Sequence, residues 1–289
     1  MRELRTLAPK MGAEIVGVDL RQMDDALFEW LHNAFLEHIV IAVRDQELTM
    51  QEFLDIGRRF GPLRPHFVKK ARHPQYPELM IMDNKVLDSR TDQTSAQTEI
   101  SLVRLATVWH TDMSYEPDRP DTTQMYALAV PSTGGDTPFV NMYAAYETLP
   151  EALRKKIEPL SATYLYGGSK KRQQDRIDEA DRNRAPASHP LVEQHPQTGR
   201  KLLYFNAGQI MNIVGVPPEE GAEIIAALVA HTESRDGDYR HQWRQHDLVI
   251  WDNRCSIHTA TGDYPLHEHR SMWRTTIDAR TTAPSSKAA

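Results

Sequence analysis

The composition of this chain is that of an ordinary globular protein, and it excludes several classes at once. The 289 residues are 40% hydrophobic and 26% charged, enough to bury a sizeable core in one large β-rich domain or two small ones. The net charge of −6 argues against a nucleic-acid or membrane-surface protein, because phosphate binding needs a cationic face. The single cysteine, Cys255, excludes an intrachain disulfide and a thiolate zinc site. We find no apolar stretch of membrane-spanning length and no signal-peptide pattern, so a cytoplasmic protein is expected.

The first part of the chain predicts two helices set between short strands. Met23–His38 carries acidic side chains in its first turn and apolar side chains at helical spacing, which is typical of an amphipathic helix. A second helix is expected at Thr49–Gly61, with Thr49 as its N-cap and Gly61 as its stop. The strands expected here are Ala13–Leu20, Ile39–Val43 and Leu79–Asp83.

From residue 122 onward the pattern is one of short strands separated by turns, with two inserted helices. The helices are expected at Ala144–Ile157 and Pro217–Glu233. The strands expected are Thr122–Val130, Gly134–Asn141, Ser161–Gly168, His189–Pro196, Gly199–Asn206, Asp247–Asn253 and Ser271–Arg280. The charged stretch Ser169–Ser188 is expected to be a mobile surface segment, and residues 281–289 a disordered tail. This order of elements predicts one domain over residues 1–289, mainly β with flanking helices.

A long polar connection, residues 84–107, leads into the stretch TVWHTDMSY and is expected to form a lid over a site. The stretch itself, Thr107–Tyr115, has the pattern of extended backbone, so His110 and Asp112 are expected on one face of a strand, where they can share a metal ion. A third ligand must come from a distant strand, and His258 is the best candidate because it follows an apolar strand and a polar turn. Two histidines and a carboxylate with open coordination positions form the facial triad of non-haem Fe(II) oxygenases. Taken alone, the tripeptide more often marks a core histidine and a turn aspartate.

Longer stretches of the chain, taken together, resemble the TauD/TfdA family of Fe(II)- and 2-oxoglutarate-dependent dioxygenases. The similarity covers most of the chain, in the order and spacing of the family. The stretches that carry it are FGPLRPH, WHTDMSY, PSTGGDTPFVNMYAAYETLP, HPLVEQHPQTGRKLLYFN, WDNRCSIHTATGDY and HRSMWRTTI. The resemblance implies a double-stranded β-helix, or jelly roll.

The resemblance also implies a role for each matching residue. Iron would be bound by His110, Asp112 and His258. The distal carboxylate of 2-oxoglutarate would be held by Thr137 and Arg270, and an arginine suits this task because its fork meets a carboxylate bidentately. The gap from His258 to Arg270 is one residue longer than in the family, and Arg270 and Arg274 are expected on one strand face, so Arg274 is the second candidate for 2-oxoglutarate. The residues expected to bind the substrate are His66, Lys69, Tyr166 and Arg274.

The function expected from this resemblance is the hydroxylation of a small organic acid, with 2-oxoglutarate and O₂ consumed and succinate and CO₂ released. The acid would be a carboxylate, sulfonate, sulfate ester or phosphonate, and the product would fragment where the new hydroxyl lies beside a heteroatom. The alternatives are desaturation or cyclisation at the same iron centre, a jelly-roll metal-dependent hydrolase or isomerase, and a non-catalytic binding module. A homo-oligomer, dimer or tetramer, is expected, with no nucleic-acid or membrane partner.

Overall fold

The computed structural model describes residues 2–69, 72–85, 107–168, 177–235, 237–265 and 267–280. Most of the expected lid (residues 84–107), the first part of the charged stretch and the expected tail (residues 281–289) lie outside the described residues. No helix in the described part is long and apolar enough to cross a bilayer.

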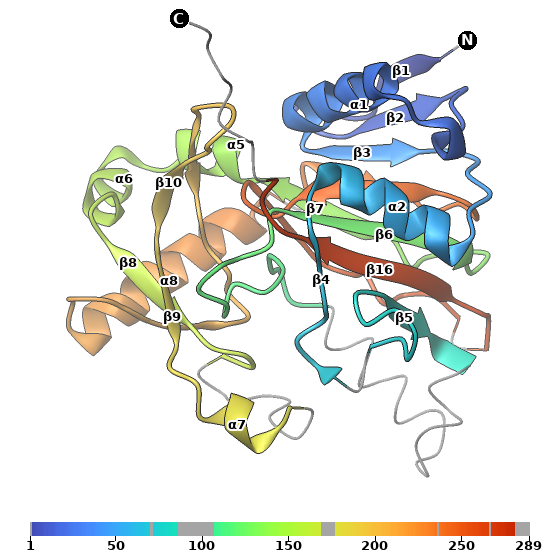
Figure 1. The fold of residues 1–289 in the computed structure, drawn as a ribbon. Helices are drawn as coiled ribbons and strands as arrows, with labels where there is room; N and C mark the ends of the chain where they lie inside the picture. The colour runs from blue at the N-terminus through green and yellow to red at the C-terminus, as the bar shows by residue number, and fades with distance from the viewer. Residues whose placement is uncertain are drawn as a thin grey trace, which may run out of the picture.

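The largest element is an eight-stranded sheet with helices on one side (Figure 1). Its strand order is β1-β2-β3-β14-β6-β16-β4, and β5 pairs with β16 beside β4. All pairs are antiparallel except β2–β3. The strands are β1 (Glu3–Thr6), β2 (Ala13–Val16), β3 (Val40–Val43), β4 (Leu63–Arg64), β5 (Met80–Asp83), β6 (Thr122–Ala129), β14 (Leu248–Asp252) and β16 (Ser271–Ile277).

Both faces of this sheet are buried, because different elements cover each one. Helices α1 (Asp25–His38) and α2 (Met50–Phe60) share a hydrophobic cluster with Leu248 and Ile250 of β14. The alternate residues Val249 and Trp251 enter a second cluster on the other face. Side chains alternate along a strand, so the continuous apolar run of β14 follows from burial on both sides.

Three smaller sheets, α8 and the short helices α5 and α6 build the other half of the molecule (Figure 1). Strand β7 lies between β13 and β15, and its Phe139 enters the same cluster as Val249 and Trp251. The strands of these sheets are β7 (Thr137–Asn141), β13 (Tyr239–His241), β15 (Ser256–His258), β8 (Ser161–Tyr164), β9 (Ala187–Pro190), β12 (Ile210–Ile213), β10 (Val192–Gln194) and β11 (Lys201–Leu203). The helices are α5 (Met142–Glu147), α6 (Glu151–Ile157) and α8 (Pro218–Glu233).

The prediction of a mainly β protein with flanking helices is confirmed, and one predicted N-cap is seen in full. Thr49 accepts from the backbone N–H of Glu52, while the Glu52 carboxylate accepts from the N–H of Thr49, which is a capping box. Gly61 ends this helix, as expected.

Several predicted boundaries were wrong for local reasons. The helix expected at Ala144–Ile157 is two helices, α5 and α6, because Pro150 between them has no N–H to donate. The strand expected at Ala13–Leu20 stops at Val16, where Gly17 takes a left-handed φ of 73°. The described end of the charged stretch contains the unpredicted helix α7 (Glu179–Arg182) and the start of β9.

Candidate functional site

Backbone pairing brings His110 and His258 together from distant parts of the chain. The N–H of His110 donates to the carbonyl of His258 at 2.9 Å, and the N–H of His258 donates back at 2.8 Å. The two ring centroids lie 4.3 Å apart. His258 ends β15, and its ring packs against Phe139 and Trp251. The small sheet therefore carries one histidine and aligns the other.

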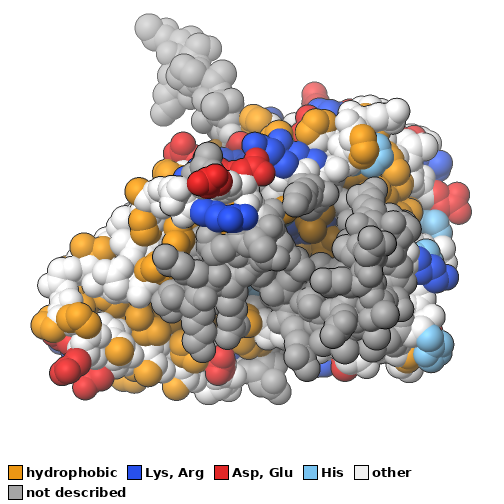
Figure 2. Space-filling view, turned by 90° about the horizontal axis from the view of Figure 1, so that it is seen from below, with side chains coloured by type: hydrophobic (Ala, Val, Ile, Leu, Met, Phe, Trp, Pro, Cys, Tyr) orange, Lys and Arg blue, Asp and Glu red, His pale blue; other side chains and the backbone are white. Residues whose placement is uncertain are grey.

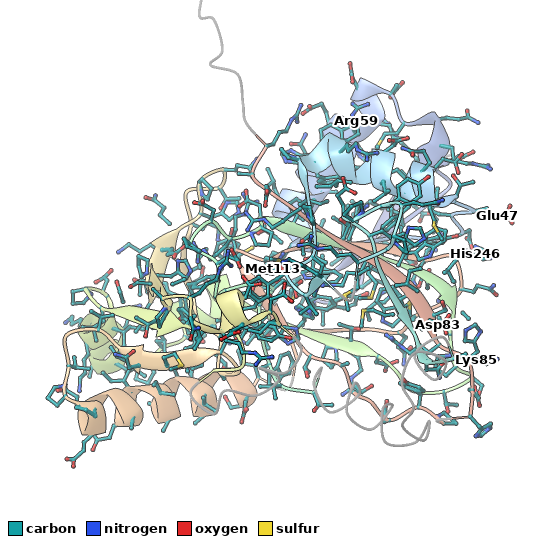
Figure 3. All side chains as sticks on the ribbon, turned by 60° about the horizontal axis from the view of Figure 1, so that its bottom comes forward. Glu47, Arg59, Asp83, Lys85, Met113 and His246 are labelled. Carbon is teal, nitrogen blue, oxygen red and sulfur yellow. The ribbon has the colours of Figure 1, made fainter. Side chains whose placement is uncertain are left out.

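Asp112 completes the group, although its backbone is not the strand that was expected. His110 makes an isolated bridge, and the chain then turns, with Met113 at a left-handed φ of 53°. Met113 lies near the middle of the molecule (Figure 3). Asp112 Oδ1 lies 3.9 Å from His110 Nε2 and 4.0 Å from His258 Nε2. The candidate ligand atoms of all three residues lie within 4.8 Å of one another, close enough to share one ion.

The protonation states around this group suit a metal. The Nδ1 of His110 lies 2.7 Å from the carbonyl of Val108; a carbonyl only accepts, so Nδ1 carries a proton and Nε2 is the nitrogen that faces Asp112. Burial and the neighbouring His110 lower the pKa of His258 to about 3, so the His258 imidazole is neutral near pH 7. Burial alone would raise the pKa of Asp112, but the Arg274 guanidinium beside it reverses this and holds the pKa well below its usual range. Two imidazoles and one carboxylate are the donor set that non-haem iron takes.

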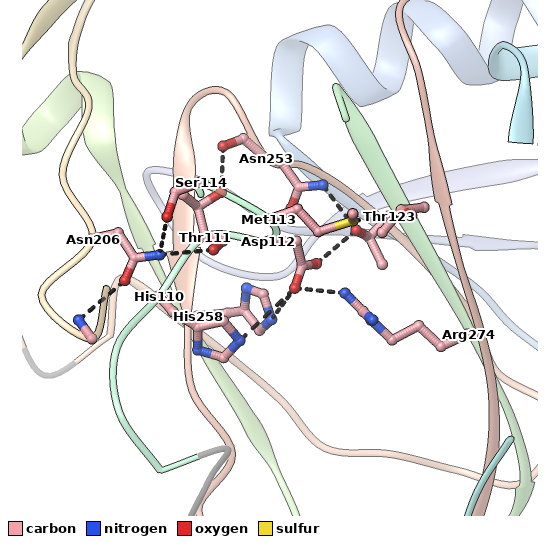
Figure 4. Close-up of polar contacts among 12 residues, drawn as sticks. His110, Thr111, Asp112, Met113, Ser114, Thr123, Asn206, Asn253, His258 and Arg274 are labelled. Carbon is pink, nitrogen blue, oxygen red and sulfur yellow. Dashed lines mark hydrogen bonds and ion pairs between the residues drawn. The ribbon is translucent and has the colours of Figure 1, made fainter. Parts of the chain in front are cut away.

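The two oxygens of Asp112 have different partners (Figure 4). Oδ1 lies 2.6 Å from Nη2 of Arg274, and Oδ2 accepts from the hydroxyl of Thr123 at 2.7 Å. The predicted substrate residue Arg274 thus reaches the site, but its guanidinium contacts Asp112, a candidate metal ligand. Thr123 was not predicted, and only its neighbourhood to Asp112 in the fold identifies it.

Arg270 lies one residue before the start of β16 (Ser271–Ile277), and its place on the same strand face as Arg274 stays a prediction. Its backbone is held by the Asn84 side chain, which accepts the Arg270 N–H at 3.0 Å, while the Asn84 N–H donates to the Arg270 carbonyl at 3.2 Å. Its Nε is buried without a hydrogen-bond partner among the described residues, and no described carboxylate pairs with it. Burial lowers the pKa of Arg270. A partly buried guanidinium whose Nε has no partner among the described residues suits an incoming anion, because an unpaired charge away from water is costly.

Thr137 begins β7, and an unpredicted residue holds its hydroxyl. The indole N–H of Trp243 donates to Thr137 Oγ1 at 2.9 Å. The preceding turn contains Gly134 and Gly135, both left-handed, with φ of 72° and 73°. The Gly135 N–H donates to the Asp263 carboxylate at 2.9 Å, and a Cβ at Gly134 would lie only 2.7 Å from that carboxylate. The glycines therefore let the long loop after His258 dock on the start of β7.

This docking also relates Arg270 to Thr137. A Cβ built on Gly135 would lie 3.6 Å from the Arg270 Nε, so the turn that leads into Thr137 passes beside the guanidinium. In this structure Arg270 therefore lies close to the start of β7, while the extra residue in the loop between His258 and Arg270 stays a prediction.

Three aromatic rings lie together near Arg274, and only one of them was predicted. The centroids of Phe67, Tyr115 and Tyr166 are 5.0, 5.4 and 5.2 Å apart in pairs. We call these three residues the aromatic wall. Burial raises the pKa of Tyr115 well above its usual range, with Arg274 and Asp112 among the charges that act on it, so the wall borders the site. Tyr115 was within the stretch first singled out, but nothing in the sequence marked Phe67.

The two remaining predicted substrate residues lie in the loop after β4. His66 Nδ1 accepts the N–H of Val68 at 3.2 Å, and burial together with Arg274 lowers the pKa of His66 to about 4. His66 is therefore neutral near pH 7 and keeps one ring N–H that can donate. The ammonium of Lys69 is exposed and pairs with Asp178 at 2.5 Å, so its contact with a substrate stays a prediction.

A second group, His195, Asp252 and Cys255, is also close enough to hold an ion, but its contacts indicate a structural role. Asp252 accepts from Arg254 Nε at 2.8 Å and Nη2 at 2.6 Å, and its Oδ2 lies 3.1 Å from His195 Nε2. The carboxylate is already neutralised by the arginine. This buried network holds the turn that precedes β15 and His258.

Two histidines and an ionised aspartate, set beside a partly buried arginine that no described carboxylate pairs with, are the arrangement of a non-haem metal oxygenase site. The model of the family described as "Taurine catabolism dioxygenase TauD, TfdA family" matches residues 3–276, and the chain belongs to this family. This membership confirms the resemblance and the predicted class of enzyme.

Relatives and solved structures agree with this assignment. The chain is 33% identical to the α-ketoglutarate-dependent 2,4-dichlorophenoxyacetate dioxygenase of Cupriavidus pinatubonensis, over 94% of this chain and 96% of the relative. It is 30% identical to an (S)-phenoxypropionate/α-ketoglutarate-dioxygenase of Sphingobium herbicidovorans (95% and 94% covered) and 31% identical to an alkylsulfatase of Acinetobacter baylyi (97% and 86% covered). A taurine dioxygenase from Burkholderia xenovorans superposes with a TM-score of 0.78 at 26% identity, covering 96% of this chain and 89% of that one. AAD-2, solved with Mn(II) and N-oxalylglycine, also gives 0.78, at 25% identity, covering 98% and 99%.

Proposed function

We propose that this protein is an Fe(II)- and 2-oxoglutarate-dependent dioxygenase that hydroxylates a small organic acid. The observation that carries the proposal is the placement of Asp112 Oδ1 at 3.9 and 4.0 Å from the Nε2 atoms of His110 and His258. The family and the α-ketoglutarate-dependent relatives support it. When bound, Fe(II) supplies the oxidative chemistry, with O₂ and 2-oxoglutarate consumed and succinate and CO₂ released.

Arg270 and Thr137 are the residues we assign to the distal carboxylate of 2-oxoglutarate. The Arg270 guanidinium offers donors that no described carboxylate uses. The Thr137 hydroxyl accepts from Trp243, so its own hydrogen is available for a carboxylate oxygen. Arg274 is the weaker candidate for this role, because it already pairs with Asp112.

Arg274 and His66 are the residues we assign to the acid group of the substrate. The guanidinium has five N–H donors; Nη2 pairs with Asp112 and Nη1 makes only a weak contact with the Met80 sulfur at 3.9 Å, so donors remain for a second anion. His66, being neutral, would add a hydrogen bond and no charge. Lys69, at the exposed end of the same loop, would contribute long-range attraction.

The aromatic wall gives the substrate's body a flat apolar surface beside this acid anchor. Aromatic rings pair with other rings in stacked or edge-on contacts worth about 0.5–1.5 kcal/mol. An acid that carries an aryl or similarly large apolar group therefore suits this surface best. The relatives that act on 2,4-dichlorophenoxyacetate and (S)-phenoxypropionate are in keeping with this choice.

The proposal also covers the double-stranded β-helix, the kind of partner, the location and the oligomeric state. The eight-stranded sheet and the β13-β7-β15 sheet would form the two layers of a double-stranded β-helix, with His258 at the end of β15. On the described part of the face in Figure 2, cationic and acidic side chains are interspersed, which favours a small-molecule substrate over a nucleic acid. A single domain, a cytoplasmic location and a homo-oligomer stay predictions, as does the choice between hydroxylation and desaturation.

The experiment that tests this function begins without oxygen. Fe(II) and 2-oxoglutarate are added together to the protein, and a weak visible absorption band of the chelated cosubstrate is expected. Oxygen is then admitted with a panel of aryloxy acids, alkyl sulfates and sulfonates, and succinate is measured. A band with substrate-dependent succinate supports the proposal. Iron-loaded protein that shows no band would favour a hydrolase or a binding module.

A further inference from the structure

The carboxylate of Asp112 is held on its far side by a series of hydrogen bonds through three buried side chains, and Figure 4 shows the part of it from Asn253 through Thr123 to Asp112. Thr123 donates to Asp112 Oδ2 at 2.7 Å, and Asn253 Nδ2 donates to the Thr123 hydroxyl at 2.8 Å. The indole N–H of Trp251 donates to Asn253 Oδ1 at 3.0 Å. None of these three side chains would be placed at the site by its position in the sequence alone.

The direction of every hydrogen bond in this chain is forced. An indole N–H can only donate, so the amide oxygen of Asn253 must face Trp251 and its NH₂ must face Thr123. The threonine hydroxyl has a single hydrogen and already accepts from the amide. That hydrogen therefore goes to Asp112 Oδ2, since an ionised carboxylate can only accept.

Because these side chains are buried, losing any one of the hydrogen bonds would be costly. Trp251 is 1% exposed, Asn253 3% and Thr123 0%, so no water can replace a lost partner, and each unpaired polar group would carry its full desolvation cost. This series of hydrogen bonds also connects the proposed metal ligands. Its first member packs its ring 4.9 Å from His258, and its last holds Asp112. The Asn253 carbonyl further accepts from the hydroxyl of Thr111, the residue between the two sequence-adjacent ligands, at 2.6 Å.

We propose that Asn253 and Thr123 are positioning residues that hold Asp112 as a one-oxygen metal ligand. The chain occupies Oδ2 and leaves Oδ1 facing the two histidines. A carboxylate free to bind through both oxygens would take one more coordination position, and the facial triad works because positions stay open for other ligands. This inference rests on the proposed metal site. It gives the segment 251–253, just before β15, the role of positioning Asp112.

The test is the affinity of the protein for Mn(II) alone, measured by anaerobic calorimetry, and of the Mn(II)-loaded protein for 2-oxoglutarate. Thr123→Val keeps the side-chain shape and deletes the hydroxyl. It should weaken Mn(II) binding by about 10- to 100-fold, the usual effect of losing an outer partner of a ligand, and weaken 2-oxoglutarate binding in addition. Thr123→Ser restores the hydroxyl and should recover most of the affinity. Where the valine variant does not fold, Thr123→Ala deletes the same hydroxyl.

The control is another buried threonine on a neighbouring strand. Thr275 is 2% exposed, and its hydroxyl has no hydrogen-bond partner among the described residues. Thr275→Val should leave Mn(II) affinity unchanged. A folded Thr123→Val protein with wild-type affinity for Mn(II) and 2-oxoglutarate would overturn the positioning role.

Trp251→Phe tests whether Trp251 acts on Asp112 through Asn253 and Thr123. It should cost less metal affinity than Thr123→Val, and the double variant should lose no more than Thr123→Val alone. Fully additive losses would mean that Trp251 acts only through its packing on His258, which contradicts the chain. Wild-type protein that binds no Mn(II) at all would instead refute the proposed function, so the two failures are distinguishable.

Discussion

Arg274 donates to the same oxygen of Asp112 that faces the two histidines, with Nη2 and Oδ1 2.6 Å apart. Both side chains are largely buried, at 11% and 6% exposure. The pair therefore compensates the aspartate charge within the protein, and it places a cation at the edge of the metal position. An anionic substrate on Arg274 would then sit close to the reacting centre, while the aspartate remains ionised for the metal.

Asp112→Asn should abolish metal binding and turnover while it keeps the side-chain shape. The loss of charge removes a metal ligand and leaves the Arg274 guanidinium without its partner. Breaking such a buried pair costs about 3–5 kcal/mol of stability. Metal calorimetry and urea unfolding measure the two effects. Asp118→Asn, at an exposed carboxylate, is the control, and a variant that keeps full activity would remove Asp112 from the triad.

Arg270→Ala should raise the 2-oxoglutarate requirement far more than the substrate requirement. Losing a charged hydrogen-bonded partner costs about 2–5 kcal/mol, which is roughly 30- to 5000-fold in affinity. The ligand-free protein should not lose stability, because the guanidinium has no carboxylate partner among the described residues. Steady-state KM values for both compounds check this, with Arg58→Ala on the surface of α2 as control. A selective rise in the substrate KM would exchange the roles of Arg270 and Arg274.

Trp243→Phe should weaken 2-oxoglutarate binding by about 3- to 10-fold, the value of one hydrogen bond of about 1 kcal/mol. Phenylalanine keeps a ring against His241 but cannot donate to Thr137. Thr137→Val should weaken 2-oxoglutarate binding more than Trp243→Phe. The double variant should bind 2-oxoglutarate as weakly as Thr137→Val alone, because Trp243 acts through the Thr137 hydroxyl. Equilibrium titration of the Mn(II)-loaded protein measures each affinity. Additive losses would assign Trp243 a separate contact.

Tyr166→Ala should lower the affinity for aryl acids by about tenfold and leave small alkyl acids nearly unchanged. The ring contacts both other members of the aromatic wall, and an aromatic pair contributes about 0.5–1.5 kcal/mol beyond its area. KM values for a matched aryl and alkyl pair of acids check the ratio. Tyr146→Ala, on the far helix α5, should not change it. Equal losses for both acids would show that the wall does not select the substrate's body.

His189 should make the fold less stable as the pH falls. Burial and Arg119 lower its pKa to about 4, and its Nε2 lies within hydrogen-bond distance of the carbonyls of Ser114 and Glu116, just after the proposed metal ligand Asp112. The unfolded chain takes up a proton near pH 6.5 and the folded one only near 4. Stability is therefore complete above about pH 6.5 and falls between the two values, by up to about 3 kcal/mol.

Urea unfolding at several pH values measures this dependence. His189→Gln removes the titrating group and keeps an N–H donor, so its stability should change less over the same range. His267→Gln, at an exposed histidine, should behave as wild type. An unchanged pH slope in the His189 variant would place the acid sensitivity at the other buried histidines.

The sequence by itself predicted most of the larger helices and strands and the candidate metal ligands. Thr49 and Glu52 stand at the spacing of a capping box, and the helix begins there. The apolar run of β14 predicted a buried strand, and its residues enter clusters on both faces of the sheet. His110, Asp112 and His258 were found from residue type and from the resemblance, because ligand chemistry is a property of the side chains themselves.

Only the tertiary structure decided how these groups act. The pairing of Arg274 with Asp112, the donation from Trp243 to Thr137 and the chain from Trp251 to Asp112 all join segments more than 100 residues apart. The turn at Met113 replaced the expected strand, yet the ligands still converge. The local sequence pattern carries the hydrophobic period and the helix or strand propensity of residues that are neighbours in the chain. Which donor bonds to which oxygen of a carboxylate depends instead on how distant strands pack together.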